Sequence, residues 1–210
     1  MKILVLDSGV GGRVVENYLK HMLDKKHKIK YISDSENVPY GSKSTEEILS
    51  LTDKMIAPYK GMYDILVPAC NTISCAMIKH KVYDEKTIDI IRPTIKILEN
   101  QNLKNLAVIC TPYTHNSGIY QKKLHCLSLP CANLARYVED DDYIKIVQEV
   151  ERITNYLIKR NINRIILGCT HYEKIDYIFR NVAPQLEFLY PGKYQAQYVL
   201  KRVLKLEKNV

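Results

Sequence analysis

Two cysteines, Cys70 and Cys169, stand directly after short apolar runs, and each is followed by polar residues that can begin a helix. The stretches LVPACNTIS and IILGCTHYE therefore share one design. A thiol at a helix N-terminus lies near the positive end of the helix dipole and near free amides, which favour the thiolate and lower the pKa. Two such thiols on opposite sides of one substrate can remove a proton from a carbon and return one to the other face, which inverts a stereocentre.

Other chemistry for the cysteines is less consistent with their spacing. A zinc site is conceivable from Cys169-x-His171, but the usual paired ligand spacings are absent. A hydrolase using Cys169 with His171 is disfavoured, because positions one residue apart rarely present a nucleophile and its base to each other. Free cysteine is among the most buried residue types, and this structural interpretation applies to the remaining four, Cys75, Cys110, Cys126 and Cys131.

The composition indicates a globular protein. The chain has 210 residues, 46% of them hydrophobic, which suits one large domain or two small ones. It has no C-x-x-C pair, no long apolar run and no signal-peptide layout in residues 1–20, so we expect a cytoplasmic protein with reduced thiols and no membrane partner. The net charge of +8 comes from scattered lysines without an aromatic-interleaved stripe, which favours a solvated surface over a nucleic-acid site.

The elements that must position the two thiols alternate between strand and helix. Helical spacing is clear at Val15, Tyr18, Leu19 and Met22. This alternation predicts an α/β fold with mostly parallel sheets, in which ligands gather beyond the carboxyl ends of the strands. The predicted strands are Ile3–Leu6, Ile29–Ile32, Ile65–Val67, Ile88–Ile91, Leu106–Ile109, Ile165–Leu167 and Glu187–Leu189.

A glycine-rich stretch, DSGVGG, follows the first predicted strand and begins at Asp7. It is not the G-x-G-x-x-G fingerprint and no P-loop lysine follows, so its glycines are interpreted as permitting a tight turn and close approach to a ligand. The Asp7 carboxylate can bind a substrate ammonium group or orient a thiol. The stretches ILVLDSG and LAVICTP, each preceding one of the cysteine segments, suggest two similar half-molecules at residues 1–90 and 100–185.

Five segments together resemble the glutamate racemases, the cofactor-independent enzymes of the Asp/Glu racemase superfamily. They occur in the family's order and cover most of the chain: DSGVGG (7–12), SDSENVPYGSKS (33–44), ACNTIS (69–74), TPYTHNSGIY (111–120) and LGCTHY (167–172). The resemblance implies two similar α/β domains, each a mostly parallel sheet flanked by helices. A pseudo-twofold axis relates them, and the active site lies between them. The first domain is expected to comprise 1–91 plus 188–210, with the last strand and helix returning to it, and the second 92–187.

The resemblance also implies roles for individual residues. Cys70 and Cys169 correspond to the two catalytic thiols, His171 to the residue that assists Cys169, and Glu139 to an acidic partner on that side. Asp7 corresponds to a catalytic carboxylate beside Cys70 and the substrate amino group. The substrate-binding residues implied in the same way are Ser8, Pro39, Tyr40, Gly41, Ser42, Asn71, Thr72, Thr114 and Thr170.

By the same resemblance, the expected activity is interconversion of L- and D-glutamate by two-base proton transfer at Cα. The expected enzyme needs no cofactor and no metal, and its product supplies peptidoglycan synthesis. Aspartate or a broader set of amino acids is the nearest alternative, and a non-catalytic binding protein descended from the family is another. Departures from the family pattern, such as Arg13 after DSGVGG, leave regulation and the oligomeric state open, a homodimer included.

Overall fold

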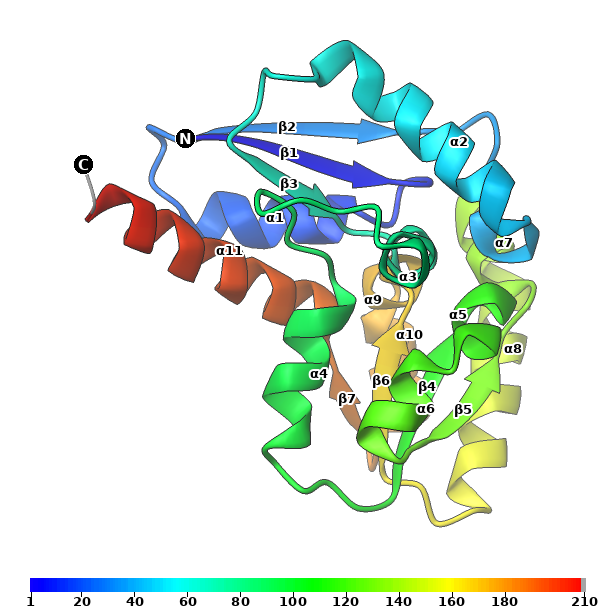
Figure 1. The fold of residues 1–210 in the computed structure, drawn as a ribbon. Helices are drawn as coiled ribbons and strands as arrows, with labels where there is room; N and C mark the ends of the chain where they lie inside the picture. The colour runs from blue at the N-terminus through cyan, green and yellow to red at the C-terminus, as the bar shows by residue number, and fades with distance from the viewer. Residues whose placement is uncertain (209–210) are drawn as a thin grey trace.

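Residues 1–208 are described by a computed structural model that contains two separate parallel sheets (Figure 1). The first sheet has the strand order β2-β1-β3, with bounds β1 Lys2–Asp7, β2 Lys28–Ser33 and β3 Ile65–Pro68. The second has the order β5-β4-β6-β7, with bounds β4 Leu106–Cys110, β5 Leu127–Pro130, β6 Arg164–Gly168 and β7 Glu187–Leu189. All pairings are parallel.

Helices flank both sheets, as the alternating pattern predicts. Those of the first half are α1 Arg13–Met22, α2 Thr45–Ile56 and α3 Asn71–His80, with 3₁₀ turns η1 Tyr40–Ser42 and η2 Ala57–Tyr59. Those that follow are α4 Ile91–Glu99, α5 Pro112–Ser117, α6 Ile119–Leu124, α7 Leu134–Glu139, α8 Tyr143–Ile158, α9 Thr170–Lys174, α10 Asp176–Val182 and α11 Pro191–Glu207. No helix within residues 1–208 is long and apolar enough to cross a membrane. The predicted α/β fold class is confirmed.

Side-chain caps stabilise the N-termini of several of these helices. Ser44 and Glu47 form a reciprocal capping box at the start of α2. The Thr111 side chain accepts from the amide of Thr114 at the start of α5, and Asp142 accepts from the amide of Lys145 at the start of α8. These polar side chains satisfy amides that have no partner within the first helical turn.

The two sheets share one topology. In each, the first strand of the half lies in the centre, flanked by the second and third, so β1, β2 and β3 correspond to β4, β5 and β6. The hypothesis of two similar half-molecules required this agreement in strand order. The equivalent strands β3 and β6 each lead into the helix that follows a cysteine.

Two expectations about strands are wrong, and one strand was not predicted. Residues 88–91 form no strand: Thr87 makes a single bridge to Leu66, and α4 begins at Ile91 because the Asp89 carboxylate accepts from two amides of its first turn. Strand β5 was not predicted. The last strand does not return to the first half, since β7 pairs with β6, and only α11 crosses back to pack against α1 (Figure 1).

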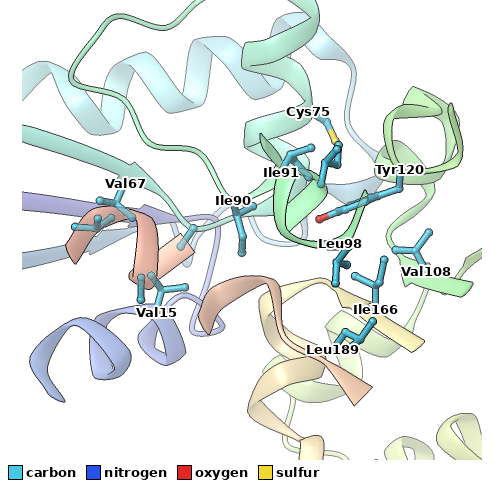
Figure 2. Close-up of a cluster of buried hydrophobic side chains, with 14 of the residues drawn as sticks. Val15, Val67, Cys75, Ile90, Ile91, Leu98, Val108, Tyr120, Ile166 and Leu189 are labelled. Atoms are coloured by element: carbon cyan, nitrogen blue, oxygen red, sulfur yellow. The ribbon is translucent and has the colours of Figure 1, made fainter. Parts of the chain in front are cut away.

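A hydrophobic core joins the two halves. One buried cluster contains Val5 and Ile65 from the first sheet together with Val108 and Ile166 from the second. Helices α4 and α11 complete it, and Figure 2 shows part of the cluster. Burying each such aliphatic side chain contributes about 1.5–3 kcal/mol. The shared core keeps the carboxyl ends of the two sheets near each other.

Candidate functional site

Cys70 and Cys169 occupy equivalent places in the two halves. Cys70 is the N-cap of α3, two residues after β3, and Cys169 is the N-cap of α9, directly after β6. Each thiol residue is 7% exposed. Both line the same small cavity, where the carboxyl ends of the two sheets meet. The structure therefore brings the two predicted thiols together.

The cavity is lined by residues from both halves. The predicted site residues that line it are Ser8, Pro39, Tyr40, Gly41, Cys70, Asn71, Thr72, Cys169 and His171. Val38, Thr111 and Ala135 also line it, and these three were not predicted as site residues. Four other predicted residues do not line the cavity but form hydrogen bonds with each other or with residues near it: Asp7, Thr114, Glu139 and Thr170. Ser42 is exposed. About 10 Å³ of free space remains in the cavity, which is room for roughly one water molecule.

The thiols do not have the lowered pKa that their helix positions predicted. Burial raises the pKa of Cys70 to about 11, with the nearby Asp7 carboxylate adding to the effect. Burial also raises the pKa of Cys169 well above its usual value. Backbone amides at the starts of α3 and α9 lower the pKa of Cys70 and Cys169, as predicted, but desolvation of the thiolate raises it by more.

On the second side, Cys169 has a histidine and a carboxylate behind it. His171 Nδ1 lies 3.6 Å from Cys169 Sγ, and His171 Nε2 makes a short hydrogen bond to Glu139. If Nε2–H donates to the carboxylate, Nδ1 of a neutral imidazole is left as an acceptor facing the thiol. Although burial opposes it, hydrogen bonds from His171 and the Val10 amide lower the pKa of Glu139. The group is thus built to receive a proton from Cys169 or return one.

On the first side, Cys70 has a hydroxyl as its side-chain hydrogen-bonding neighbour and, among residues 1–208, no imidazole. Ser8 Oγ lies 3.5 Å from Cys70 Sγ. Asp7 is fully buried, and its carboxylate accepts from the Gly9 amide and from Thr170 Oγ1, each at 2.9 Å. Burial raises the pKa of Asp7, while His171 acts in the opposite direction. Asp7 therefore links the first strand to α9 across the two halves.

Donors suited to an anionic ligand gather at the start of α3. Asn71 is buried, its Oδ1 accepts from Tyr120, and its Nδ2 has no hydrogen-bond partner among residues 1–208. Thr72 Oγ1 lies 2.9 Å from Thr111 Oγ1. Helix N-termini present free amides and positive potential, which bind carboxylates. A buried amide without a partner is costly in a folded protein, and Asn71 Nδ2 is therefore available to donate a hydrogen bond into the cavity that Asn71 lines.

The η1 segment forms the opposite wall. Tyr40 is 1% exposed, and its hydroxyl donates to Asp34 Oδ2 at 2.7 Å, so the ring is held in place. A Cβ atom at Gly41 would lie 2.6 Å from Thr111 Cβ, so only glycine allows η1 to approach the second half this closely. The wall therefore depends on contact between the halves.

Comparison with known proteins shows extended similarity to racemases. No protein-family model matches the chain. It is 32% identical to the glutamate racemase of Aliarcobacter butzleri over 201 residues, which covers 87% of this chain and 76% of that relative. It is 33% identical to the glutamate racemase of Caulobacter sp. over 225 residues, with 88% and 78% covered.

Solved structures show the same similarity in three dimensions. The chain resembles glutamate racemase isoform RacE1 from Bacillus anthracis with a TM-score of 0.84 and 30% identity, covering 98% of this chain and 82% of that one. It resembles the aspartate racemase of Picrophilus torridus with a TM-score of 0.72, covering 96% and 93%. Identity to the latter is 19%, so that likeness concerns the fold alone.

Proposed function

The chain belongs to the glutamate racemase family of isomerases, and from that premise we propose that it interconverts L- and D-glutamate with Cys70 and Cys169 as its two acid–base groups. The observation that carries the proposal is that two thiols, from equivalent positions in the two halves, line one cavity. In this proposal the reaction needs no bound cofactor. One thiolate removes the α-proton, and the opposite thiol protonates the other face.

The second thiol exchanges its proton through His171. His171 Nδ1 takes the proton from Cys169 to form the thiolate, while Glu139 holds the ring and stabilises the imidazolium. On the other side, Ser8 and Asp7 lie beside the substrate amino group and Cys70, and Ser8 contacts the thiol directly.

The α-carboxylate of the substrate binds at the start of α3, where Asn71 and Thr72 line the cavity. As the α-proton leaves, negative charge moves onto this carboxylate, and donors already in place stabilise it. Thr170 supports the site through its bond to Asp7. The side-chain carboxylate binds along η1, at Tyr40, Gly41 and Ser42, and Thr114 supports Thr111 from behind.

Entry of glutamate requires the two halves to separate, because little free space remains in the cavity. The bonds that close the site connect the halves: Val10 to Glu139, Asp7 to Thr170, and Thr45 to Tyr113. The moving units in this proposal are the domains predicted from the sequence, with β7 assigned to the second. Their closure excludes water from the reacting carbon.

The first experiment follows purified protein with L-glutamate in deuterium oxide, without pyridoxal phosphate or metal. Circular dichroism and the α-proton NMR signal are recorded together. Loss of both signals is the expected result, because each racemisation event exchanges the α-proton with solvent. Unchanged signals from folded protein contradict the proposal, and aspartate is then tested under the same conditions. The family suggests that the D-glutamate formed is used for peptidoglycan.

A further inference from the structure

The beginning of α11 makes polar contacts with both thiol-bearing elements. Figure 1 shows that α11 leaves the second half after β7 and runs beside α1 of the first half. Its first five residues, 191–195, are called the α11 brace below. Two buried polar side chains, Glu173 and Gln195, form its contacts. Neither belongs to the cavity lining.

Glu173 connects the brace to the helix of the second thiol. It lies in α9, whose N-cap is Cys169, and is 4% exposed. Its Oε1 accepts from the Gly192 amide at 2.6 Å, while Oε2 has no hydrogen-bond partner among residues 1–208. A Cβ at Gly192 would lie 2.9 Å from Glu173 Oε2, so glycine permits this approach. The buried carboxyl thus ties α9 to the first turn of α11.

Gln195 connects the same brace to the strand that precedes the first thiol. It is fully buried, and its Nε2 donates to Pro68 O at 2.9 Å and to Ile88 O at 2.8 Å. Pro68 ends β3, two residues before Cys70, and its carbonyl also accepts from Ser74 of α3 at 3.1 Å. The oxygen Oε1 of Gln195 has no partner in the described part of the chain.

We propose that the α11 brace sets the separation of the two thiols, with Glu173 and Gln195 as positioning residues. Burying incompletely paired polar groups opposes folding, so a purely structural role is better filled by apolar side chains. Two-base racemisation requires both thiols to be aligned with one carbon, and a misplacement of about 1 Å can lower the rate about a hundredfold. This inference rests on the proposed function.

The test uses full-length variants that remove one contact at a time. Glu173→Ala removes the acceptor for the Gly192 amide, and Glu173→Gln restores an acceptor. Gln195→Met keeps a long side chain without the amide. Thr154→Val is the matched control, a buried polar change in α8 whose hydroxyl, within the described part of the chain, bonds only to backbone of its own helix. Circular dichroism and thermal melting establish that each variant is folded.

Turnover separates positioning from a general loss of stability. Glu173→Ala and Gln195→Met are expected to lower kcat by about tenfold to a hundredfold with KM changed by less than about threefold. Glu173→Gln is expected to stay within about threefold of the parent, and Thr154→Val to lower stability without lowering kcat. If Glu173→Gln loses as much kcat as Glu173→Ala, or if both alanine and methionine variants keep full kcat, the proposal is wrong.

Isotope effects then show which thiol is displaced. With substrate deuterated at Cα, Glu173→Ala is expected to raise the primary isotope effect for one enantiomer, the one whose proton Cys169 removes. Gln195→Met is expected to raise it for the other enantiomer, because it frees the Cys70 element. Equal changes in both directions for both variants contradict separate contacts to the two thiols.

Amide hydrogen exchange provides a readout independent of activity. Glu173→Ala is expected to increase exchange in residues 167–175, and Gln195→Met in residues 66–75, because each contact holds one of the two segments to the brace. Unchanged exchange in the segment that touches the altered residue overturns the brace. A parent chain inactive on glutamate refutes the proposed function instead, and the exchange result then decides on the brace by itself.

Discussion

The two halves place equivalent cysteines at equivalent strand ends but surround them differently. Behind Cys169 lies an imidazole held by a carboxylate, whereas beside Cys70 lie a serine hydroxyl and, more distantly, the buried Asp7. Helix α3 after Cys70 has ten residues and α9 after Cys169 has five. Topology therefore sets where the two thiols lie, while the neighbouring side chains set how each exchanges its proton.

This difference has a direct kinetic meaning for a racemase. The two enantiomers present their α-protons to opposite thiols, so each direction of reaction begins on a different side. The ratio of kcat/KM for the two enantiomers equals the equilibrium constant of the reaction, so it cannot report the difference between the two thiols. Isotope effects on the first proton transfer can report it, since they depend on the thiol that removes the proton.

The largest effect is expected from replacing either thiol, which tests what the two sides share. Cys70→Ser and Cys169→Ser each remove one acid–base group and are expected to lower kcat by more than about a thousandfold, because a serine hydroxyl is a far weaker acid than a thiol. Polarimetric or circular dichroism assays of both directions measure this. Cys126→Ser, another buried cysteine outside the cavity lining, is the control and should keep its activity. Near-normal turnover in both thiol variants rules out the two-thiol mechanism.

A smaller, one-sided effect is expected from the imidazole. His171→Asn removes the group behind Cys169 and is expected to lower kcat about a hundredfold. The isotope effect with Cα-deuterated substrate should rise for one enantiomer only. Glu139→Gln retains an acceptor for the Val10 amide and should have a milder effect in the same direction, about tenfold. Equal isotope effects for both enantiomers mean that His171 serves the two sides alike.

Stability against pH tests the buried carboxyl of Glu173 on the second side. Burial raises the pKa of Glu173 to about 8, the Gly192 amide opposes this, and Asp176 adds to it. Because the folded-state pKa lies above the unfolded one, the folded state binds the extra proton, and stability falls as pH rises between the two values. The free energy of unfolding is expected to fall by up to about 1.4 kcal/mol per pH unit in that window. Urea unfolding at several pH values measures it.

Glu173→Gln is the control for this pH dependence, since glutamine cannot ionise. Its stability curve should be flatter than that of the parent chain between about pH 5 and pH 8. If the free energies of unfolding of the two proteins change in parallel with pH, ionisation of Glu173 does not destabilise the folded state. The carboxyl then has access to water or to a counter-charge in solution.

Most of the strands that the sequence predicted correctly are buried along nearly all of their length, such as β1 and β4, whereas β2 was predicted although its residues are partly or fully exposed. Strand β5 lies at a sheet edge with every residue partly or fully exposed, so it has no apolar run to detect. Ile90 and Ile91 are fully buried at the start of a helix, which a short apolar run cannot distinguish from a strand. The three residues of β7 carry no information about which sheet they join.

The site was partly predictable for a similar reason. Strand ends locate Cys70 and Cys169, because parallel strands bring their carboxyl ends to one edge. The predicted direction of their pKa shift was wrong, because desolvation depends on burial in the folded chain, which no local sequence pattern records. Thr111 caps α5 and lines the cavity, but its place there depends on the contact between the halves, which its position in the sequence does not indicate.

The smallest effect is expected from Ser8 on the first side. Ser8→Ala removes a hydroxyl 3.5 Å from Cys70 Sγ, a long contact to a weak hydrogen-bonding sulfur. Loss of one such contact should lower kcat by only about threefold to tenfold, with the isotope effect rising for the enantiomer opposite to the one affected by His171→Asn. A loss as large as that of His171→Asn would mean that Ser8 relays the proton of Cys70. Each thiol would then have its own proton relay, Ser8 for Cys70 and His171 for Cys169, and the two sides would differ in the chemical nature of that relay.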